Sequence, residues 1–275
     1  MQIHPMTGSL GAEITDADIR SDADWSGIRQ AFIDYGVITI RDQQITPDDQ
    51  LAFARRWGDV NVNRFFTPLD THPEIAVVLK EPDQSTAVGE AWHTDHSYDT
   101  EPAMCSILRA IDVPPFGGDT CFSSMYAAYD ALSDRFKDLL SRLNAWHSSR
   151  HAFGFSVTDH ESYETGRLHN PENATQDSLH PVVIKHPLSG RKALYVNPDF
   201  TTQIDGLHKD ESDAILAFLY THCQNADFQC RVSWRKGDVT MWDNRATWHK
   251  AINDYHGHRR YMHRVTVEGC ALEPA

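Results

Sequence analysis

The sequence lacks several features that would place it in a specialised class of protein. No apolar run approaches the roughly 18 residues of a membrane-spanning helix, and residues 1–14 carry neither the basic nor the apolar segment of a secretory signal. Basic residues are in deficit, because 25 Lys and Arg face 39 Asp and Glu and leave a net charge of −14. This balance argues against nucleic acid or an anionic membrane as a partner, since their phosphates attract clusters of Lys and Arg. The expected location is the cytoplasm.

Cysteine motifs for disulfides or metal clusters are also missing. The cysteines are odd in number and no two are spaced as C-x-x-C, which is typical of reduced, mostly buried thiols. They are Cys105, Cys121, Cys223, Cys230 and Cys270. Repeats and low-complexity tracts are absent. The chain has 275 residues, of which 40% are hydrophobic and 10% aromatic, so we expect a single domain over residues 1–275 with a sizeable core.

Periodicity along the chain predicts many short strands and a few helices. Apolar spacing predicts a helix over residues 25–35 that is capped by Gly36, and Thr46 followed by Pro47 predicts the start of another. This mixture is typical of a mainly β chain with helices (α+β), built as a barrel or sandwich such as a jelly roll. The segment around residues 154–178 is polar and lacks periodicity, which predicts a long, lid-like loop inserted into the domain.

Two histidines and one carboxylate are spaced as metal ligands. His93 and Asp95 are two residues apart, and in a β-strand such residues point to the same side. His249 is the candidate third ligand. Two histidines and one carboxylate on one face of a metal leave positions open, as in the facial triad of non-haem Fe(II) oxygenases. The His-x-Asp pattern alone equally fits an ordinary surface strand, and the three residues would also suit a zinc hydrolase.

Two further motifs accompany these residues. Gly117–Thr120 reads as a tight turn that ends in a hydroxyl group, and Arg260 and Arg264 are spaced to share one face of a predicted strand. Two inward-facing guanidinium groups are costly unless each meets an anion, and arginine binds carboxylates or sulfonates through two parallel hydrogen bonds. The alternative is a basic surface strand whose arginines form solvated ion pairs.

Together these motifs resemble the Fe(II)/2-oxoglutarate-dependent taurine/2,4-dichlorophenoxyacetate dioxygenase family, and the resemblance runs nearly end to end. The motifs that carry it are His93-x-Asp95, Gly117–Thr120, Trp242-Asp243-Asn244-Arg245 with His249, and Arg259-Arg260-x-x-x-Arg264. Supporting motifs are Met125–Tyr129, His180–Val183 and Ser189–Arg191. The resemblance implies a double-stranded β-helix, which is a jelly-roll core with helices packed outside it.

The resemblance also implies roles for individual residues. His93, Asp95 and His249 would be the ligands of Fe(II), and O₂ would bind at the same metal. Thr120 and Arg260 would hold the distal carboxylate of 2-oxoglutarate. A homo-oligomer is implied as well.

Five substrate-binding residues follow from the same resemblance. Arg264 matches the arginine that binds the acidic group of the substrate in the taurine branch. Phe153 and Phe200 fall where that branch has aromatic residues in the substrate pocket, although both also suit ordinary core packing. Asn63 and Phe66 stand where the taurine enzymes carry a His and a Tyr.

These departures bear on the substrate. Gly89 stands where the taurine enzymes have an Asn, so with the changes at Asn63 and Phe66 taurine itself is a poor match and a larger or more apolar acid is favoured. Asp95 is present, whereas halogenating relatives replace this carboxylate by a small residue, so halogenation is not expected.

The expected function is hydroxylation of an unactivated C–H bond in a small anionic organic acid, a carboxylate or a sulfonate. The enzyme would depend on Fe(II) and 2-oxoglutarate and would release succinate and CO₂. Two alternatives remain at this stage. One is a catabolic dioxygenase that cleaves C–S or C–O bonds, as in the taurine, alkylsulfonate and phenoxyacetate enzymes. The other is a metal-binding jelly-roll module without turnover.

Overall fold

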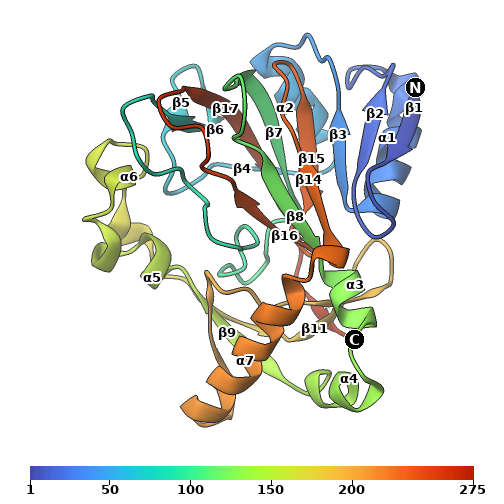
Figure 1. Ribbon diagram of the computed structural model, residues 1–275, viewed down its shortest axis with the longest axis vertical. Coiled ribbons are helices and arrows are strands. Elements are labelled where there is room, and N and C mark those ends of the chain that lie inside the picture. The colour runs from blue at the N-terminus through green and yellow to red at the C-terminus, as the bar shows by residue number, and fades with distance from the viewer.

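Two β-sheets face each other across the interior of the protein, which we describe from a computed structural model that covers residues 1–275 (Figure 1). The larger sheet has the strand order β1 (Gln2–Pro5), β2 (Ala12–Thr15), β3 (Val37–Ile40), β15 (Val239–Asp243), β7 (Cys105–Asp112), β17 (Arg260–Val267), β6 (His72–Lys80) and β5 (Pro68–Leu69), and β4 (Val60–Asn61) pairs with β17. The smaller sheet consists of β14 (Gln229–Val232), β8 (Thr120–Ser124) and β16 (Thr247–Ala251).

Strands from the two halves of the chain alternate in both sheets. β7 lies between β15 and β17, and β8 lies between β14 and β16, with antiparallel pairing throughout. Apolar side chains of both sheets, such as Met262 and Phe122, meet in one buried cluster between them. This interleaved two-sheet arrangement confirms the predicted mainly β fold with a double-stranded β-helix core.

Helices cover the outer faces of the sheets (Figure 1). Those of the α type are α1 (Asp22–Tyr35), α2 (Pro47–Arg55), α3 (Met125–Asp130), α4 (Asp134–Leu140), α5 (Arg150–Phe153), α6 (Glu161–Glu164) and α7 (Lys209–Cys223). Short 3₁₀ helices are η1 (Phe155–Val157), η2 (Pro171–Asn173) and η3 (Ala226–Phe228). None of the helices is both long enough and apolar enough to cross a lipid bilayer.

The first two helices begin and end where local sequence predicts. Gly36 ends α1 in a left-handed conformation with φ 68°, and its N–H donates to the Phe32 carbonyl. The Thr46 side chain accepts from the Asp49 N–H at the start of α2, and Pro47 occupies the first helical position. Both helices bury their apolar faces against the larger sheet in a shared cluster, and they therefore hold the outer side of β15, β7 and β17 in place.

Two small sheets complete the fold. They are β10 (Asp177–Pro181), β9 (Asn144–Ser148) and β13 (Thr201–Ile204), and β12 (Lys192–Leu194), β11 (Val183–Lys185) and β18 (Glu273–Pro274). Together with α3 and α7 they pack a further buried cluster against the smaller sheet.

The segment around residues 154–178 was predicted as a loop without regular structure, and this detail is wrong. It contains η1, α6 and η2, and β10 begins at Asp177. Each helical piece has only three or four residues, which is too short to show apolar periodicity in the sequence. The segment lies beside α5 at the edge of the cavity described below (Figure 1).

Candidate active site

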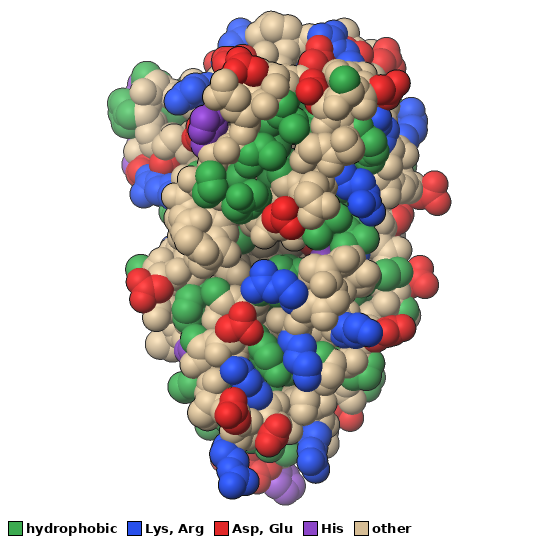
Figure 2. All heavy atoms as spheres, turned by 90° about the vertical axis from the view of Figure 1, so that its right-hand side faces the viewer, with side chains coloured by type: hydrophobic (Ala, Val, Ile, Leu, Met, Phe, Trp, Pro, Cys, Tyr) green, Lys and Arg blue, Asp and Glu red, His purple; other side chains and the backbone are tan.

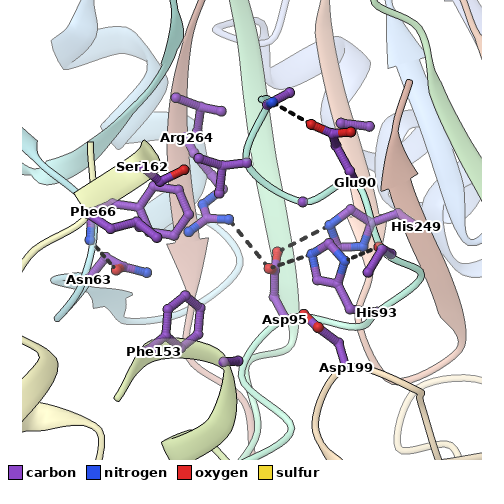
Figure 3. Close-up of a pocket in the computed structure, with 18 of the residues that line it drawn as sticks. Asn63, Phe66, Glu90, His93, Asp95, Phe153, Ser162, Asp199, His249 and Arg264 are labelled. Atoms are coloured by element: carbon purple, nitrogen blue, oxygen red, sulfur yellow. Dashed lines mark hydrogen bonds and ion pairs between the residues drawn. The ribbon is translucent and has the colours of Figure 1, made fainter. Parts of the chain in front are cut away.

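His93, Asp95 and His249 come together at one end of the space between the two sheets (Figure 3). The three potential ligand atoms lie within 4.8 Å of one another. His93 Nε2 is 3.7 Å from Asp95 Oδ1, and His249 Nε2 is 3.8 Å from Asp95 Oδ2. All three residues are buried, so the sequence prediction that they converge is correct.

A single β-bridge aligns the two histidines. The His93 N–H donates to the His249 carbonyl at 3.1 Å, and the His249 N–H donates back at 2.8 Å. The segment that holds His93 and Asp95 is otherwise irregular, so their convergence does not require the continuous strand that the sequence suggested. The Nδ1–H of His93 donates to the Ala91 carbonyl at 2.8 Å, so Nε2 is the ring nitrogen that faces Asp95 and is available to a metal.

The charge states of these residues suit metal binding. Burial alone would raise the pKa of Asp95, but the positive Arg264 and the neighbouring histidines outweigh it and hold that pKa well below its usual value. Ser106 Oγ also donates to Asp95 Oδ2 at 2.6 Å. Burial lowers the pKa of His249, and His93 adds to the effect. An ionised carboxylate at Asp95 and a neutral imidazole at His249 are protonation states that a divalent metal requires.

Arg260 lies on one side of this set, next to Thr120. Its Nε–H donates to the Gly118 carbonyl at 3.1 Å, and burial lowers its pKa. The neighbouring Arg259 pairs with the carboxylate of Glu81, whereas Arg260 has no such partner. The Trp234 Nε1–H donates to Thr120 Oγ1 at 3.0 Å, which leaves the hydroxyl proton free to donate elsewhere. A guanidinium and a hydroxyl donor therefore face a space that suits a carboxylate.

The turn before Thr120 needs glycine. Gly117 and Gly118 have φ of 69° and 67°, in the left-handed region. A Cβ on Gly118 would lie 3.3 Å from Arg260 Cδ, so a larger residue would also push against the arginine.

Arg264 lies on the other side of the set. Its guanidinium stacks over the Phe66 ring at 4.1 Å from the centroid, and Nη1 is 3.4 Å from Asp95 Oδ1. Arg260 and Arg264 are both buried and share one face of β17, as the sequence predicted. They are not exposed members of a basic surface strand.

A cavity of about 460 Å³ surrounds these groups. It is lined by Thr120, Arg260, Arg264 and by all four of the other predicted substrate residues, Asn63, Phe66, Phe153 and Phe200. Figure 3 shows Asn63, Phe66 and Arg264 on the side of the pocket opposite His93 and His249. Phe153 and Phe200 face the cavity in addition to packing with other aromatic rings.

Three further residues at this site were not among the predicted site residues. His96 and Tyr98 line the cavity, and Ser106 binds Asp95. His96 and Tyr98 do not continue the alternation of His93 and Asp95, so the only available signal was their nearness to that motif in the sequence. Ser106 is a single serine within a largely apolar strand, and nothing in the sequence marks it as a partner of Asp95.

A jelly-roll core that holds two histidines and one carboxylate beside a buried arginine without an anionic partner is typical of the class of non-haem Fe(II) oxygenases that use a carboxylate co-substrate. The sequence matches the family described as taurine catabolism dioxygenase TauD, TfdA family over residues 2–266, and the chain belongs to that family.

Relatives with assigned activities match across most of the chain. A 2,4-dichlorophenoxyacetate dioxygenase of Burkholderia sp. is 36% identical over 256 residues, which cover 86% of this chain and 84% of the relative. A sulfate ester dioxygenase of Pseudomonas putida is 31% identical over 280 residues, 98% of this chain and 90% of the relative. The crystal structure of a taurine dioxygenase from Burkholderia xenovorans has 29% identity and a TM-score of 0.82, and the match covers 98% of this chain and 92% of that structure.

The protein is therefore an Fe(II)- and 2-oxoglutarate-dependent dioxygenase that uses O₂. The interpretations as a zinc hydrolase or as a metal-binding module without turnover leave Arg260 and Thr120 without a role, and neither is retained.

Proposed function

We propose that the enzyme oxidises a small organic anion with an apolar or aromatic body, at a carbon next to the anionic group. His93, Asp95 and His249 would hold Fe(II), and Arg260 with Thr120 would bind the distal carboxylate of 2-oxoglutarate. Arg264 would bind the anionic group of the substrate. The observation that carries this proposal is the presence of two buried arginines on one face of β17, with the three metal-ligating groups between them.

When bound, Fe(II) with 2-oxoglutarate and O₂ supplies an oxidant strong enough for an unactivated C–H bond, and succinate and CO₂ are the co-products. The chain contributes binding, orientation and exclusion of water. Arg264 places the anionic end of the substrate, and because Phe66 lies flat beneath its guanidinium, that end is held on the side of the cavity away from His93 and His249.

The walls of the cavity favour a substrate larger and more apolar than taurine. Phe66, Phe153, Phe200 and Tyr98 provide aromatic surface, and the nearby Val88 and Leu168 are aliphatic. Gly89 places no side chain against His93, where a Cβ would lie only 3.1 Å from His93 Cε1. A sulfate ester and a phenoxyacetate are named for two relatives, and both compounds combine an anion with such a body.

We also propose that residues 154–178 act as a lid-like insertion within a single domain over residues 1–275. Val157, Tyr163 and Leu168 of this segment line the cavity, and Glu161 ties it to the loop that follows β6. A segment held this way can shield the reacting carbon from water while still opening to admit substrate.

The test is succinate formation with Fe(II), ascorbate and 2-oxoglutarate, against a panel of 2,4-dichlorophenoxyacetate, hexyl sulfate, hexanesulfonate and taurine. We expect strong stimulation by at least one of the first three and weak stimulation by taurine. His249→Ala should abolish turnover while near-UV circular dichroism stays unchanged. Stimulation by taurine alone, or normal succinate formation by His249→Ala, would contradict the proposal.

Product analysis separates the two outcomes that this chemistry allows. A single product that keeps the whole substrate skeleton and gains one oxygen indicates simple hydroxylation. Release of sulfate, sulfite or a phenol indicates that oxidation of the carbon beside the heteroatom breaks the C–O or C–S bond.

A further inference from the structure

The residue directly after Asp95 has an unusual backbone conformation. His96 has a φ of 59°, in the left-handed region, which only four non-glycine residues of the chain occupy. The other three are Asp16, Asp42 and Asn170, and Asp and Asn tolerate this region because their short side chains bond locally. Histidine also occurs in this region more often than most residues do, and in His96 contacts of the ring help to hold the conformation.

Both ring nitrogens of the buried His96 have partners. Nδ1 lies 3.0 Å from Asp99 Oδ2, and both oxygens of that carboxylate accept from Arg64 Nη2 at 2.7 Å. The His180 imidazole contacts the Asp99 carbonyl at 3.0 Å. Because an ionised carboxylate can only accept, Nδ1 carries the proton in this contact. The other nitrogen, Nε2, lies 3.3 Å from Asn63 Nδ2.

Backbone contacts determine which way the Asn63 amide faces. Its Oδ1 accepts from the N–H groups of Phe65 at 2.9 Å and of Phe66 at 3.0 Å. The amide nitrogen must therefore be the atom that faces His96, and Nε2 of the imidazole is its acceptor. An amide nitrogen has two N–H groups, and this contact uses one of them.

The remaining N–H of Asn63 has no partner within the protein. Asn63 lines the cavity, and Figure 3 shows its amide nitrogen directed into the pocket, with the Phe66 ring between it and Arg264. Arg264 also lines this cavity. An organic anion that Arg264 holds in the cavity can therefore also accept from the free N–H of Asn63.

We propose that His96 is a positioning residue for substrate binding, which holds the Asn63 amide so that its free N–H forms a second contact to the anion bound by Arg264. This inference rests on the proposed function, in which Arg264 binds the substrate anion. The order of contacts is Arg64, Asp99, His96 and then Asn63, so an ion pair near the surface fixes the orientation of a donor inside the cavity.

Two substitutions at one position separate the two ring nitrogens. His96→Asn keeps a residue suited to the left-handed backbone and places its amide near the Nδ1 position, but loses the contact to Asn63. His96→Gln extends far enough to present an oxygen near the Nε2 position. Asn63→Ala, alone and combined with His96→Asn, tests whether His96 acts through Asn63.

The readout is the Kd of 2,4-dichlorophenoxyacetate and of hexyl sulfate by titration calorimetry, with protein that carries Mn(II) and 2-oxoglutarate so that no turnover occurs. We expect His96→Asn to weaken binding of the anions about 10-fold, as for loss of one hydrogen bond to a charged group. His96→Gln should restore most of this loss, and the Kd of 2-oxoglutarate should not change in either variant. In the Asn63→Ala background, His96→Asn should have no further effect.

Each other outcome overturns the inference. Unchanged anion binding in His96→Asn would show that the contact to Asn63 is unimportant. Equal losses in the Asn and Gln variants, or parallel losses for 2-oxoglutarate, would indicate a purely structural role. Additive losses in the double variant would mean that His96 contacts the substrate itself. If the unmodified enzyme binds neither anion, the proposed substrate class fails and this inference fails with it, whereas the first three outcomes leave that class intact.

Discussion

Two arginines four positions apart on β17 have different surroundings, and the difference separates their roles. Arg260 contacts the Gly118 carbonyl and lies with its guanidinium 5.6 Å from the centre of the Trp234 ring, with no carboxylate as partner. Arg264 contacts Asp95 and stacks on Phe66. Each retains hydrogen-bonding capacity toward the cavity, one on each side of the metal-ligating groups, so we expect each to bind a different anion.

Single substitutions should separate the two functions. Arg260→Ala should raise the KM for 2-oxoglutarate about 100-fold, because removing one partner of a buried charge pair costs several kcal/mol. Arg264→Ala should raise the KM for the organic anion by a similar factor and leave the slow decay of 2-oxoglutarate without substrate unchanged. Steady-state succinate assays measure both quantities. Arg259→Ala is the matched control, because Arg259 is exposed and pairs with Glu81, and it should change neither KM. Exchanged phenotypes would show that the assignments are reversed.

The sequence alone predicted the residues whose chemistry requires a rare combination. Residue types and spacing made candidates of His93, Asp95, His249, Arg260 and Arg264, since a facial triad needs such ligands and inward arginines need anions. Each pattern also fitted an ordinary surface strand, and the family resemblance was needed to assign the roles. Ser106 could not be predicted, since many serines occur in strands and only the three-dimensional structure brings this one to Asp95.

At the scale of elements, the cavity is closed on one side by the short helices of residues 154–178. Glu161 in α6 accepts from the backbone N–H groups of Ser85 and Thr86 and from the Thr86 hydroxyl, and Arg167 contacts the same carboxylate. These hydrogen bonds, led by the Ser85 N–H, lower the pKa of Glu161 to about 2, so the carboxylate stays ionised at neutral pH. One side chain therefore joins residues 154–178 to residues 84–91, six of which line the cavity.

Glu161→Gln should loosen this connection, because a neutral amide accepts hydrogen bonds more weakly and offers one oxygen instead of two. We expect faster amide hydrogen exchange in residues 84–90 and 154–168, and a larger fraction of 2-oxoglutarate consumed without oxidation of the substrate. Exchange mass spectrometry and the ratio of succinate to oxidised product measure these effects. Glu172→Gln makes the same charge change on an exposed residue of the segment and should leave both unchanged. Equal behaviour of the two variants would argue against a lid function.

Elements with strong local signals were predicted, and elements that depend on distant partners were not. α1 and α2 follow from apolar spacing and from capping by Gly36 and Thr46. The alternation of strands from both halves of the chain, such as β7 between β15 and β17, is a property of the whole fold and leaves no local pattern. The helices of residues 154–178 were missed because each spans about one turn.

At the scale of the whole molecule, a strongly acidic protein carries uncompensated positive charge in its interior. The net charge is −14, and Figure 2 shows acidic and basic side chains interspersed on the face it presents. Inside the cavity, by contrast, Arg260 is buried without an anionic partner. A buried, unpaired charge destabilises the native state, and an anion that pairs with it removes part of this cost.

The homo-oligomer that the family resemblance implies stays a prediction, and sedimentation analysis would test it.

Ligands should therefore stabilise the fold in two separable steps. Mn(II) should raise Tm through His93, Asp95 and His249, and 2-oxoglutarate should raise it further through Arg260. At 100 times Kd each ligand contributes about 2.7 kcal/mol, and in a chain of this size that corresponds to an increase of roughly 5–10 °C. Arg260→Ala should keep the Mn(II) step and lose most of the 2-oxoglutarate step, whereas His249→Ala should lose the first and weaken the second, because the co-substrate also binds the metal. Thermal unfolding followed by circular dichroism measures both steps without turnover. A full 2-oxoglutarate step in Arg260→Ala would mean that the buried guanidinium is compensated in another way and is not the site of the distal carboxylate.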